Sequence, residues 1–226
     1  GYKKNFNFIK VSLLKCSLIN FIYINIINSM NSKNKKVEEI VKYLVFLNMD
    51  QLKSICNNYG IYYNIFIERN NNVIKTSEVD HKETIINNIS YYLKKNKIPP
   101  KTLYKKKIIN FLKLEKISKE DFIYYGQYKT TNKIILNLLK ELTNGNFKFG
   151  AISQKIIRKI WKGNKLITYE NFAKLWEKEN EKGGINYPEL AYNQFMKKYG
   201  STEEWYNHKR NILKELSKTF NFLKIE

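Results

Sequence analysis

Apolar residues recur at the spacing of a helix over the first regular part of the chain. One stripe consists of Val37, Ile40, Val41, Leu44 and Val45, which are three or four positions apart and predict a single buried face. A second helix is expected over residues 49–58, capped by Asn48 and ended by Gly60. A third is expected over residues 81–95. Together these segments predict a small helical module.

Residues 62–79 follow a different pattern. Two runs rich in β-branched and aromatic residues flank the polar stretch Arg69-Asn-Asn-Asn. Such runs on either side of a short Asn-rich turn predict a β-hairpin. The hairpin would be an insertion in the helical module.

Turn and capping residues divide the remainder into further helices. Pro99-Pro100 marks the boundary before them, because neither proline can continue a helix. The expected helix starts are Thr131, Ser153, Thr168, Pro188 and Ser201. The fold class is therefore expected to be mainly α. The predicted organisation is a basic leader over 1–32, a helical module over 33–97, a lysine-rich linker over 98–107 and a C-terminal helical domain over 108–226.

The first 30 residues differ from the rest, because they contain lysines and a broken apolar run but no acidic residue. Two interpretations stay open. Organelle-targeting segments have this basic, acid-poor composition. Alternatively, the segment results from translation upstream of a natural start at Met30, which is the interpretation we favour. No fold or function is inferred from it.

The chain carries 41 Lys and Arg against 20 Asp and Glu, a formal net charge of +21. An excess of this sign is typical of nucleic-acid-binding proteins. Only Arg69, Arg158 and Arg210 are arginines, whereas Asn, Ile, Lys, Tyr and Phe are abundant, as an AT-rich genome would encode. The positions of the lysines are therefore more informative than their number.

The lysines gather most densely on either side of Pro99-Pro100, and no acidic residue lies between Glu83 and Glu115. The members of this group are Lys94, Lys95, Lys97, Lys101, Lys105, Lys106 and Lys107. Such a segment can follow phosphates, and the neighbouring tyrosines could stack on exposed bases. The alternative is a solvated linker.

The region Leu47–Leu93 resembles the SAP family of small DNA-binding modules. The resemblance lies in Leu47-Asn-Met-Asp-Gln-Leu-Lys-Ser-Ile-Cys-Asn-Asn-Tyr-Gly-Ile61 and in His81-Lys-Glu-Thr-Ile-Ile-Asn-Asn-Ile89. It implies a SAP-like helix pair that contacts the DNA backbone and minor groove, with Lys53 and Lys82 at the basic positions. The connecting loop holds about twenty residues here, whereas the loop of the family is brief.

Residues 128–210 resemble an uncharacterised domain that accompanies SAP modules in some bacterial and large-DNA-virus proteins. The matching positions are mainly aromatic and turn residues, such as Tyr128, Asn146, Trp176 and Phe195. This resemblance implies co-occurrence with a DNA-binding module and no known activity.

Two consecutive helices, expected over 153–161 and 168–181, permit a helix-turn-helix arrangement. Its phosphate-facing residues would be Lys155, Arg158, Lys159, Lys162 and Lys165. Plain core packing of the two helices is the alternative that we favour. Trp161, Trp176 and Trp205 are likewise expected to be core anchors.

Enzyme signatures are lacking in the sequence. The two histidines, His81 and His208, have no metal-ligand spacing with each other or with a cysteine. Cys56 lies on an apolar helix face, as an inert buried thiol would. The carboxylates Glu170, Glu177, Glu179 and Glu181 alternate with lysines, which is typical of an exposed helix surface. We expect no enzyme and no cofactor or metal.

The expected function is largely sequence-independent binding of the phosphate backbone of nucleic acid, double-stranded DNA in particular. The predicted binding residues are Lys53, Lys82 and the seven lysines between Lys94 and Lys107. The alternative is a structural component of a large nucleic-acid-containing assembly, such as a virion, and a metal-dependent nuclease ranks below it. We expect an intracellular protein, of the nucleus or a virion, without a membrane partner.

Overall fold

The computed structural model describes residue 32, residues 34–183 and residues 187–223. Predictions for the leader therefore fall almost entirely outside the described residues. The chain divides into a unit of residues 1–42 and a unit of residues 43–226. Residues 34–44 are helical and Val37, Ile40 and Leu44 are buried, which confirms the first predicted helix. The second unit contains all the features discussed below.

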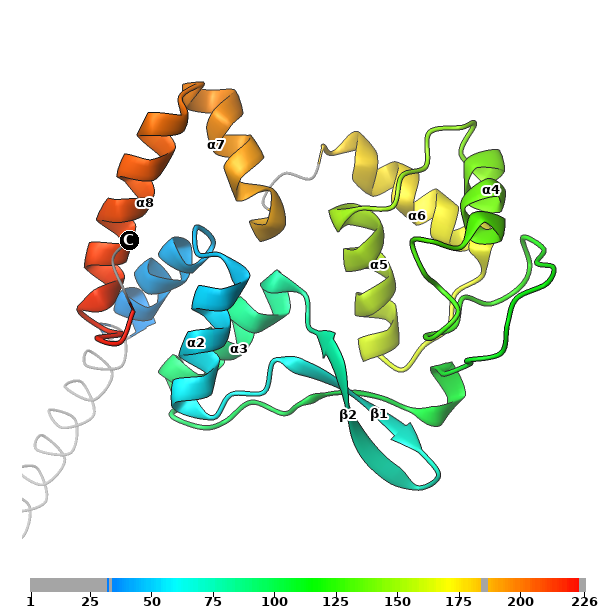
Figure 1. Cartoon of the computed structure of the whole chain (residues 1–226), viewed down its shortest axis with the longest axis horizontal. Coiled ribbons are helices and arrows are strands. Elements are labelled where there is room, and N and C mark those ends of the chain that lie inside the picture. The colour runs from blue at the N-terminus through cyan, green and yellow to red at the C-terminus, as the bar shows by residue number, and fades with distance from the viewer. Residues whose placement is uncertain (1–31, 33, 184–186, 224–226) are drawn as a thin grey trace, which may run out of the picture. The chain divides into compact units, whose positions relative to one another are not determined.

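The described residues between 43 and 223 are mainly helical and contain one small sheet (Figure 1). The helices are α2 (Met49–Tyr59), α3 (Lys82–Lys95), α4 (Lys133–Leu142), α5 (Ala151–Lys162), α6 (Tyr169–Glu181), α7 (Ala191–Tyr199) and α8 (Thr202–Ser217), with the short 3-10 helices η1 (Lys106–Ile108) and η2 (Pro188–Leu190). The strands are β1 (Asn64–Arg69), β2 (Asn72–Val79) and β3 (Thr102–Tyr104). The mainly α class is confirmed. The specific SAP-like arrangement of α2 and α3 stays a prediction.

The predicted hairpin is present as β1 and β2, paired antiparallel in a sheet of order β2-β1-β3. Arg69 pairs with Asn72, so the loop consists of Asn70 and Asn71. Both have positive φ, 49° and 61°. Two-residue hairpin loops favour this left-handed backbone because its twist matches that of the strands, and Asn adopts it more readily than most residues. The Asn-rich turn therefore sets the register of the hairpin.

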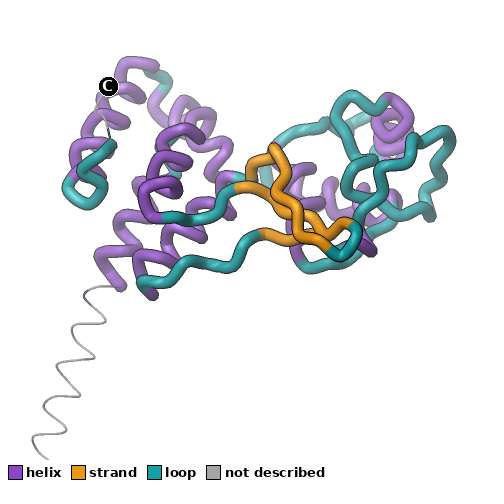
Figure 2. The backbone as a smooth tube through the Cα atoms, turned by 60° about the horizontal axis from the view of Figure 1, so that its bottom comes forward, coloured by secondary structure: helices purple, strands orange, loops and turns teal. Residues whose placement is uncertain are grey.

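The segment 98–107, predicted as a linker, forms structure of its own. Its residues Thr102–Tyr104 are β3, which pairs in parallel with β1, and Tyr104 is fully buried. Parallel partners are distant in sequence, and here α3 lies between β1 and β3 along the chain. No local sequence pattern therefore predicts this strand. Figures 1 and 2 show the strands between the α2–α3 pair and the α4–α6 group.

One hydrophobic core joins the sheet to α4, α5 and α6. It includes Ile65 and Ile67 of β1, Tyr104 of β3, Trp161 of α5 and Trp176 of α6. The indole Nε1 of Trp161 donates a hydrogen bond to the carbonyl oxygen of Ile123 at 3.1 Å. The core thus extends across the boundary predicted at 98–107. Trp161 and Trp176 are core anchors as predicted, whereas Trp205 is half-buried.

The cap residues agree in part with the predicted ones. Asn48, Thr168 and Ser201 each accept a backbone N–H at the start of α2, α6 and α8. The start predicted at Thr131 is wrong by one residue, since the side chain of Asn132 caps α4. The start predicted at Ser153 is wrong by three.

The α5 helix begins after Gly150, and Ser153 is its third residue. The Ser153 hydroxyl accepts the N–H of Gly150 and donates to its carbonyl oxygen, both at 3.0 Å. A serine at this position can therefore stabilise the helix start without being the N-cap.

Among the described residues, no helix is long and apolar enough to cross a membrane.

Candidate phosphate-binding cleft

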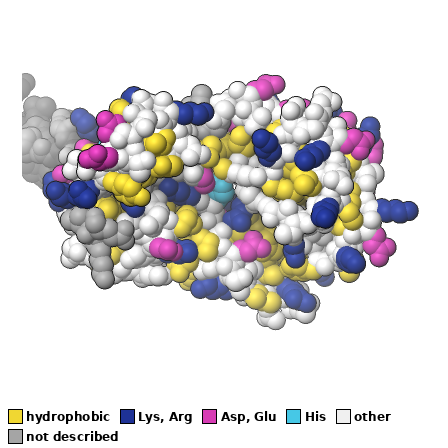
Figure 3. All heavy atoms as spheres, turned by 45° about the horizontal axis from the view of Figure 1, so that its top comes forward, with side chains coloured by type: hydrophobic (Ala, Val, Ile, Leu, Met, Phe, Trp, Pro, Cys, Tyr) yellow, Lys and Arg dark blue, Asp and Glu magenta, His cyan; other side chains and the backbone are white. Residues whose placement is uncertain are grey.

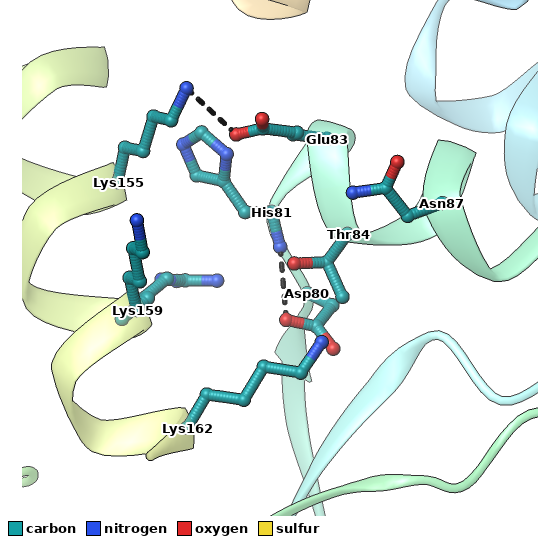
Figure 4. A pocket seen from close by; sticks show the side chains of 9 residues that line it. Asp80, His81, Glu83, Thr84, Asn87, Lys155, Lys159 and Lys162 are labelled. Atoms are coloured by element: carbon teal, nitrogen blue, oxygen red, sulfur yellow. Dashed lines mark hydrogen bonds and ion pairs between the residues drawn. The ribbon is translucent and has the colours of Figure 1, made fainter. Parts of the chain in front are cut away.

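A cleft of about 300 Å³ lies between the first turns of α3 and one face of α5. The α3 side contributes Asp80, His81, Glu83, Thr84 and Asn87, and the α5 side contributes Lys155, Arg158, Lys159 and Lys162 (Figure 4). Lys155 is three and four residues from Arg158 and Lys159, and Lys162 is four and three residues beyond them, so the four cations share one face of the helix. Figure 3 shows Lys and Arg side chains scattered over the visible face, some of them near a histidine that is visible in its middle.

The amphipathic pattern of α5 orients this basic face. Ile156, Ile157 and Trp161 are buried in the core. Because they occupy one side of the helix, the residues between them must lie on the other sides. The α5 helix therefore has two faces. One face packs in the core, as predicted, and another carries the basic residues that the sequence suggested as phosphate-facing.

Two of the four cations are engaged by neighbouring groups. The Lys155 ammonium lies 2.9 Å from Glu83 Oε2 and 4.0 Å from the centroid of the Tyr187 ring. The Arg158 guanidinium donates to the Val79 carbonyl oxygen at 2.7 Å and lies 3.8 Å from Glu78. These contacts hold α5 against α3 and β2.

Lys159 and Lys162 are different, because both are exposed and neither forms an ion pair with any residue that the structure describes. Lys162 reaches toward Asp80 in Figure 4. Asp80 itself is only 5% exposed and accepts the N–H of His81 at 3.2 Å. Burial raises the pKa of Asp80, against the opposing effect of Lys162 and Arg158. The cleft therefore offers two exposed ammonium groups beside a carboxyl that burial makes less acidic.

The other face of the α3 start is held by η2. His81 Nδ1 lies 2.6 Å from Glu189 Oε1, which also accepts the N–H of Glu83 at 3.2 Å. Burial opposes the ionisation of Glu189, but the contact with His81 holds the pKa of that carboxyl below its usual value. His81 is thus a packing residue at the start of α3, and its position in the cleft was not foreseen.

The residues predicted from the SAP resemblance lie elsewhere. Lys82 points away from solvent, and its ammonium donates to the carbonyl oxygens of Val45 at 2.6 Å and Pro188 at 3.0 Å. Burial lowers the pKa of Lys82 to about 8. Lys53 pairs with Asp50 at 3.2 Å on the surface of α2. The structure does not bring these two lysines into the cleft.

The lysine group around Pro99-Pro100 divides into two. Lys94, Lys95 and Lys97 are at the C-terminal end of α3, and a helix of 14 residues separates its two ends by about 20 Å. Lys101 lies over the Phe66 ring, 4.7 Å from its centroid.

Lys105, Lys106 and Lys107 instead lie beside the C-terminal end of α5. The backbone N–H of Lys105 donates to Asn164 Oδ1 at 2.9 Å, and Asn164 is two residues beyond the end of α5. The Lys105 ammonium is 3.6 Å from Glu68, which also accepts the N–H of Lys106 at 3.2 Å. The structure thus brings the segment of these three predicted residues beside the C-terminal end of α5, which the exposed Lys165 follows in sequence.

The chemistry available in the cleft is that of an anion site. No group of three or more His, Cys, Asp or Glu among the described residues could hold a metal ion. Cys56 is fully buried, and burial raises the pKa of its thiol to about 12.

No protein-family model matches this chain, and no match was found among curated proteins or solved structures.

Proposed function

We propose that this chain binds the phosphate backbone of nucleic acid, with double-stranded DNA as the ligand, through the basic face of α5. The observation that carries the proposal is the pair Lys159 and Lys162, two exposed ammonium groups on one helix face with no ion-pair partner among the described residues. Ammonium groups in this state can exchange bound counterions for phosphates, and counterion release favours binding.

The acidic residues near the pair support the proposal, because Asp80 is buried with a raised pKa and the others are already paired. Glu83 is held by Lys155 and Glu78 by Arg158. Glu68 is held by Lys105. A phosphate that approaches Lys159 therefore meets neutralised carboxylates rather than free ones.

The lysines at the end of α5 extend the basic surface that the phosphate backbone of the nucleic acid would contact. Lys165 and the predicted residues Lys105, Lys106 and Lys107 are exposed and lie beside the same end of the helix. A phosphate chain contacts several cations at once, so a basic face that continues beyond one pocket fits a polyanion better than a single small anion. Lysines act as point charges rather than as bidentate donors, and the expected binding is accordingly little dependent on sequence.

A salt titration on duplex DNA tests the proposal. The wild-type affinity should fall steeply between about 50 and 200 mM salt, and a Lys159→Gln, Lys162→Gln variant should reduce the slope of log affinity against log salt by roughly two. The matched control is Lys174→Gln with Lys178→Gln, which removes two exposed lysines from α6. The control should keep a slope closer to that of the wild type.

Two results would contradict the proposal. One is an affinity for duplex DNA that stays flat over this range of salt. The other is an equal loss of slope in the α5 variant and the α6 control, since binding would then follow net charge and not this face of α5.

A further inference from the structure

Two large apolar side chains stand exposed at the turn after η1. Leu112 is 75% exposed and Phe111 is 54% exposed. They are adjacent in sequence, and three residues separate them from the lysines 105–107. A pair of this kind costs solubility, so its presentation to solvent calls for a physical reason.

Hydrogen bonds fix the turn that carries Phe111 and Leu112. Asn110 Oδ1 accepts the N–H of Leu112 at 2.9 Å, and the Leu112 carbonyl oxygen accepts Gln127 Nε2 at 3.1 Å. The N–H of Asn110 donates to the Tyr125 carbonyl oxygen at 2.9 Å. These bonds tie the turn to the buried segment around Tyr125, so the exposure of the pair is a feature of the folded chain.

Gly126 permits the close packing behind Phe111. Its φ is +97°, and a Cβ there would lie 2.5 Å from Phe111 Cδ1 and 2.7 Å from the Asn110 carbonyl oxygen. Only glycine has neither the steric penalty at this φ nor the atom that would collide. The ring of Phe111 also contacts that of Tyr125, with centroids 6.1 Å apart. One edge of the phenyl ring is thus supported, and about half of the Phe111 surface stays exposed.

The surroundings of the pair are basic. The Arg69 guanidinium lies 6.0 Å from the centroid of the Phe111 ring. Lys113 follows the pair directly, Lys107 lies four residues before Phe111, and both lysines are exposed. This charge fits a polyanionic partner and disfavours an ordinary apolar protein groove. Two side chains also offer far less apolar area than the extended helix face by which proteins settle on a lipid surface.

From these observations we propose that Phe111 and Leu112 insert as a wedge between stacked base pairs of the bound DNA, from the minor groove. This inference rests on the proposed function. Phe and Leu are typical of such wedges, which partly unstack one base step and kink the duplex. Arg69, Lys107 and Lys113 would then neutralise the phosphates on either side of the kink. With the wedge the protein would bend the DNA that it binds, whereas its cations alone would bind a straight duplex.

The test measures bending on a duplex of about 30 base pairs with a donor and an acceptor fluorophore at its ends, for which a kink changes the transfer efficiency. Wild type should increase the transfer. Phe111→Ala with Leu112→Ala should abolish most of that increase and weaken binding by about tenfold, with an unchanged salt slope because no cation is removed. The matched control, Phe122→Ala with Ile134→Ala, removes an exposed phenyl and an exposed aliphatic side chain from other parts of the surface and should bend DNA as wild type does.

The wedge is overturned if wild type binds DNA without increased transfer, or if the Phe111 and Leu112 variant bends DNA fully. It is also overturned if that variant keeps DNA affinity and instead loses binding to phosphatidylserine vesicles, since the turn would then contact a membrane. Failure of the proposed function is a different result, namely the absence of salt-dependent DNA binding by the wild type.

Discussion

Lysines on two neighbouring helices have opposite environments in this protein. Lys82, the first residue of α3, directs its ammonium to two backbone carbonyl oxygens and is largely removed from water. Lys159 and Lys162 of α5 are exposed and have no ion pair among the described residues. The first lysine connects parts of the chain, and the other two are available to a ligand.

The difference shows why the position of a lysine in a motif does not fix its role. A carbonyl oxygen without a hydrogen bond is costly when buried, and a lysine that reaches it becomes part of the fold. Lys159 and Lys162 form no ion pair among the described residues, and under the proposed function their charges bind an external anion. The predictions below test this contrast, from the largest expected effect to the smallest.

Replacing Lys82 by Met should lower the free energy of unfolding by about 2–3 kcal/mol, because the carbonyl oxygens of Val45 and Pro188 would lose their donor. Urea unfolding measures this change. The control is Lys53→Met, whose surface pair with Asp50 should contribute no more than about 1 kcal/mol. If Lys82→Met instead leaves stability unchanged and weakens DNA binding, Lys82 is a DNA contact, as the SAP resemblance implied.

The environment of Lys82 also predicts a pH dependence of stability. Burial lowers its pKa in the folded chain to about 8, below the usual lysine value of 10.5. Between these values the unfolded chain keeps the proton and the folded chain releases it, so stability should rise with pH. Burial also raises the pKa of Tyr125 and Tyr187 to about 12, and the stability that these residues contribute is lost only above about pH 10, where tyrosine ionises in the unfolded chain.

The window for this measurement is therefore pH 8 to about 10. Over that window the unfolding free energy of wild type should increase relative to that of Lys82→Met in the same buffers. Parallel curves for the two proteins would show that the ammonium of Lys82 is not held as the structure describes.

The smallest effect on stability is expected from the α5 pair. Lys159→Gln with Lys162→Gln should change the unfolding free energy by no more than about 0.5 kcal/mol, because exposed side chains without partners contribute little. Thermal or urea unfolding of this variant, beside Lys82→Met, gives the direct contrast. A loss comparable to that of Lys82→Met would mean that the pair stabilises the fold and is not reserved for a ligand.

Much of the fold could be predicted from the sequence because its signals are local. The helix over 49–58 follows from its apolar spacing together with Asn48 and Gly60, and the hairpin follows from the Asn-rich turn. β3 could not be predicted in the same way. It has three residues between lysines, and its partner β1 is more than thirty residues earlier, so its existence depends on a contact that no short pattern encodes.

The candidate site was predictable only in its separate parts. The spacing of Lys155, Arg158, Lys159 and Lys162 shows one basic face on a helix, and the sequence raised it as an alternative to plain packing. The opposite wall of the cleft, with Asp80 and His81, comes from a segment about 75 residues away. Its position depends on how α3 packs, and sequence spacing does not reveal that. For the same reason the two lysine groups on either side of Pro99-Pro100 look continuous in the sequence and are separate in the fold.

The pairing of β3 with β1 also determines where the chain can be cut. A fragment that ends at residue 97, where the prolines suggest a natural boundary, would contain β1 without its neighbour. Ile65 and Ile67, buried in the intact chain, would then be on a strand with an open hydrogen-bonding edge, which is a template for association with other copies. Because Ile65, Ile67 and Tyr104 also pack in one core with residues of α5 and α6, a cut near residue 97 removes both the strand and the core partners, and insolubility of such a fragment would reflect these losses rather than a property of the helical pair.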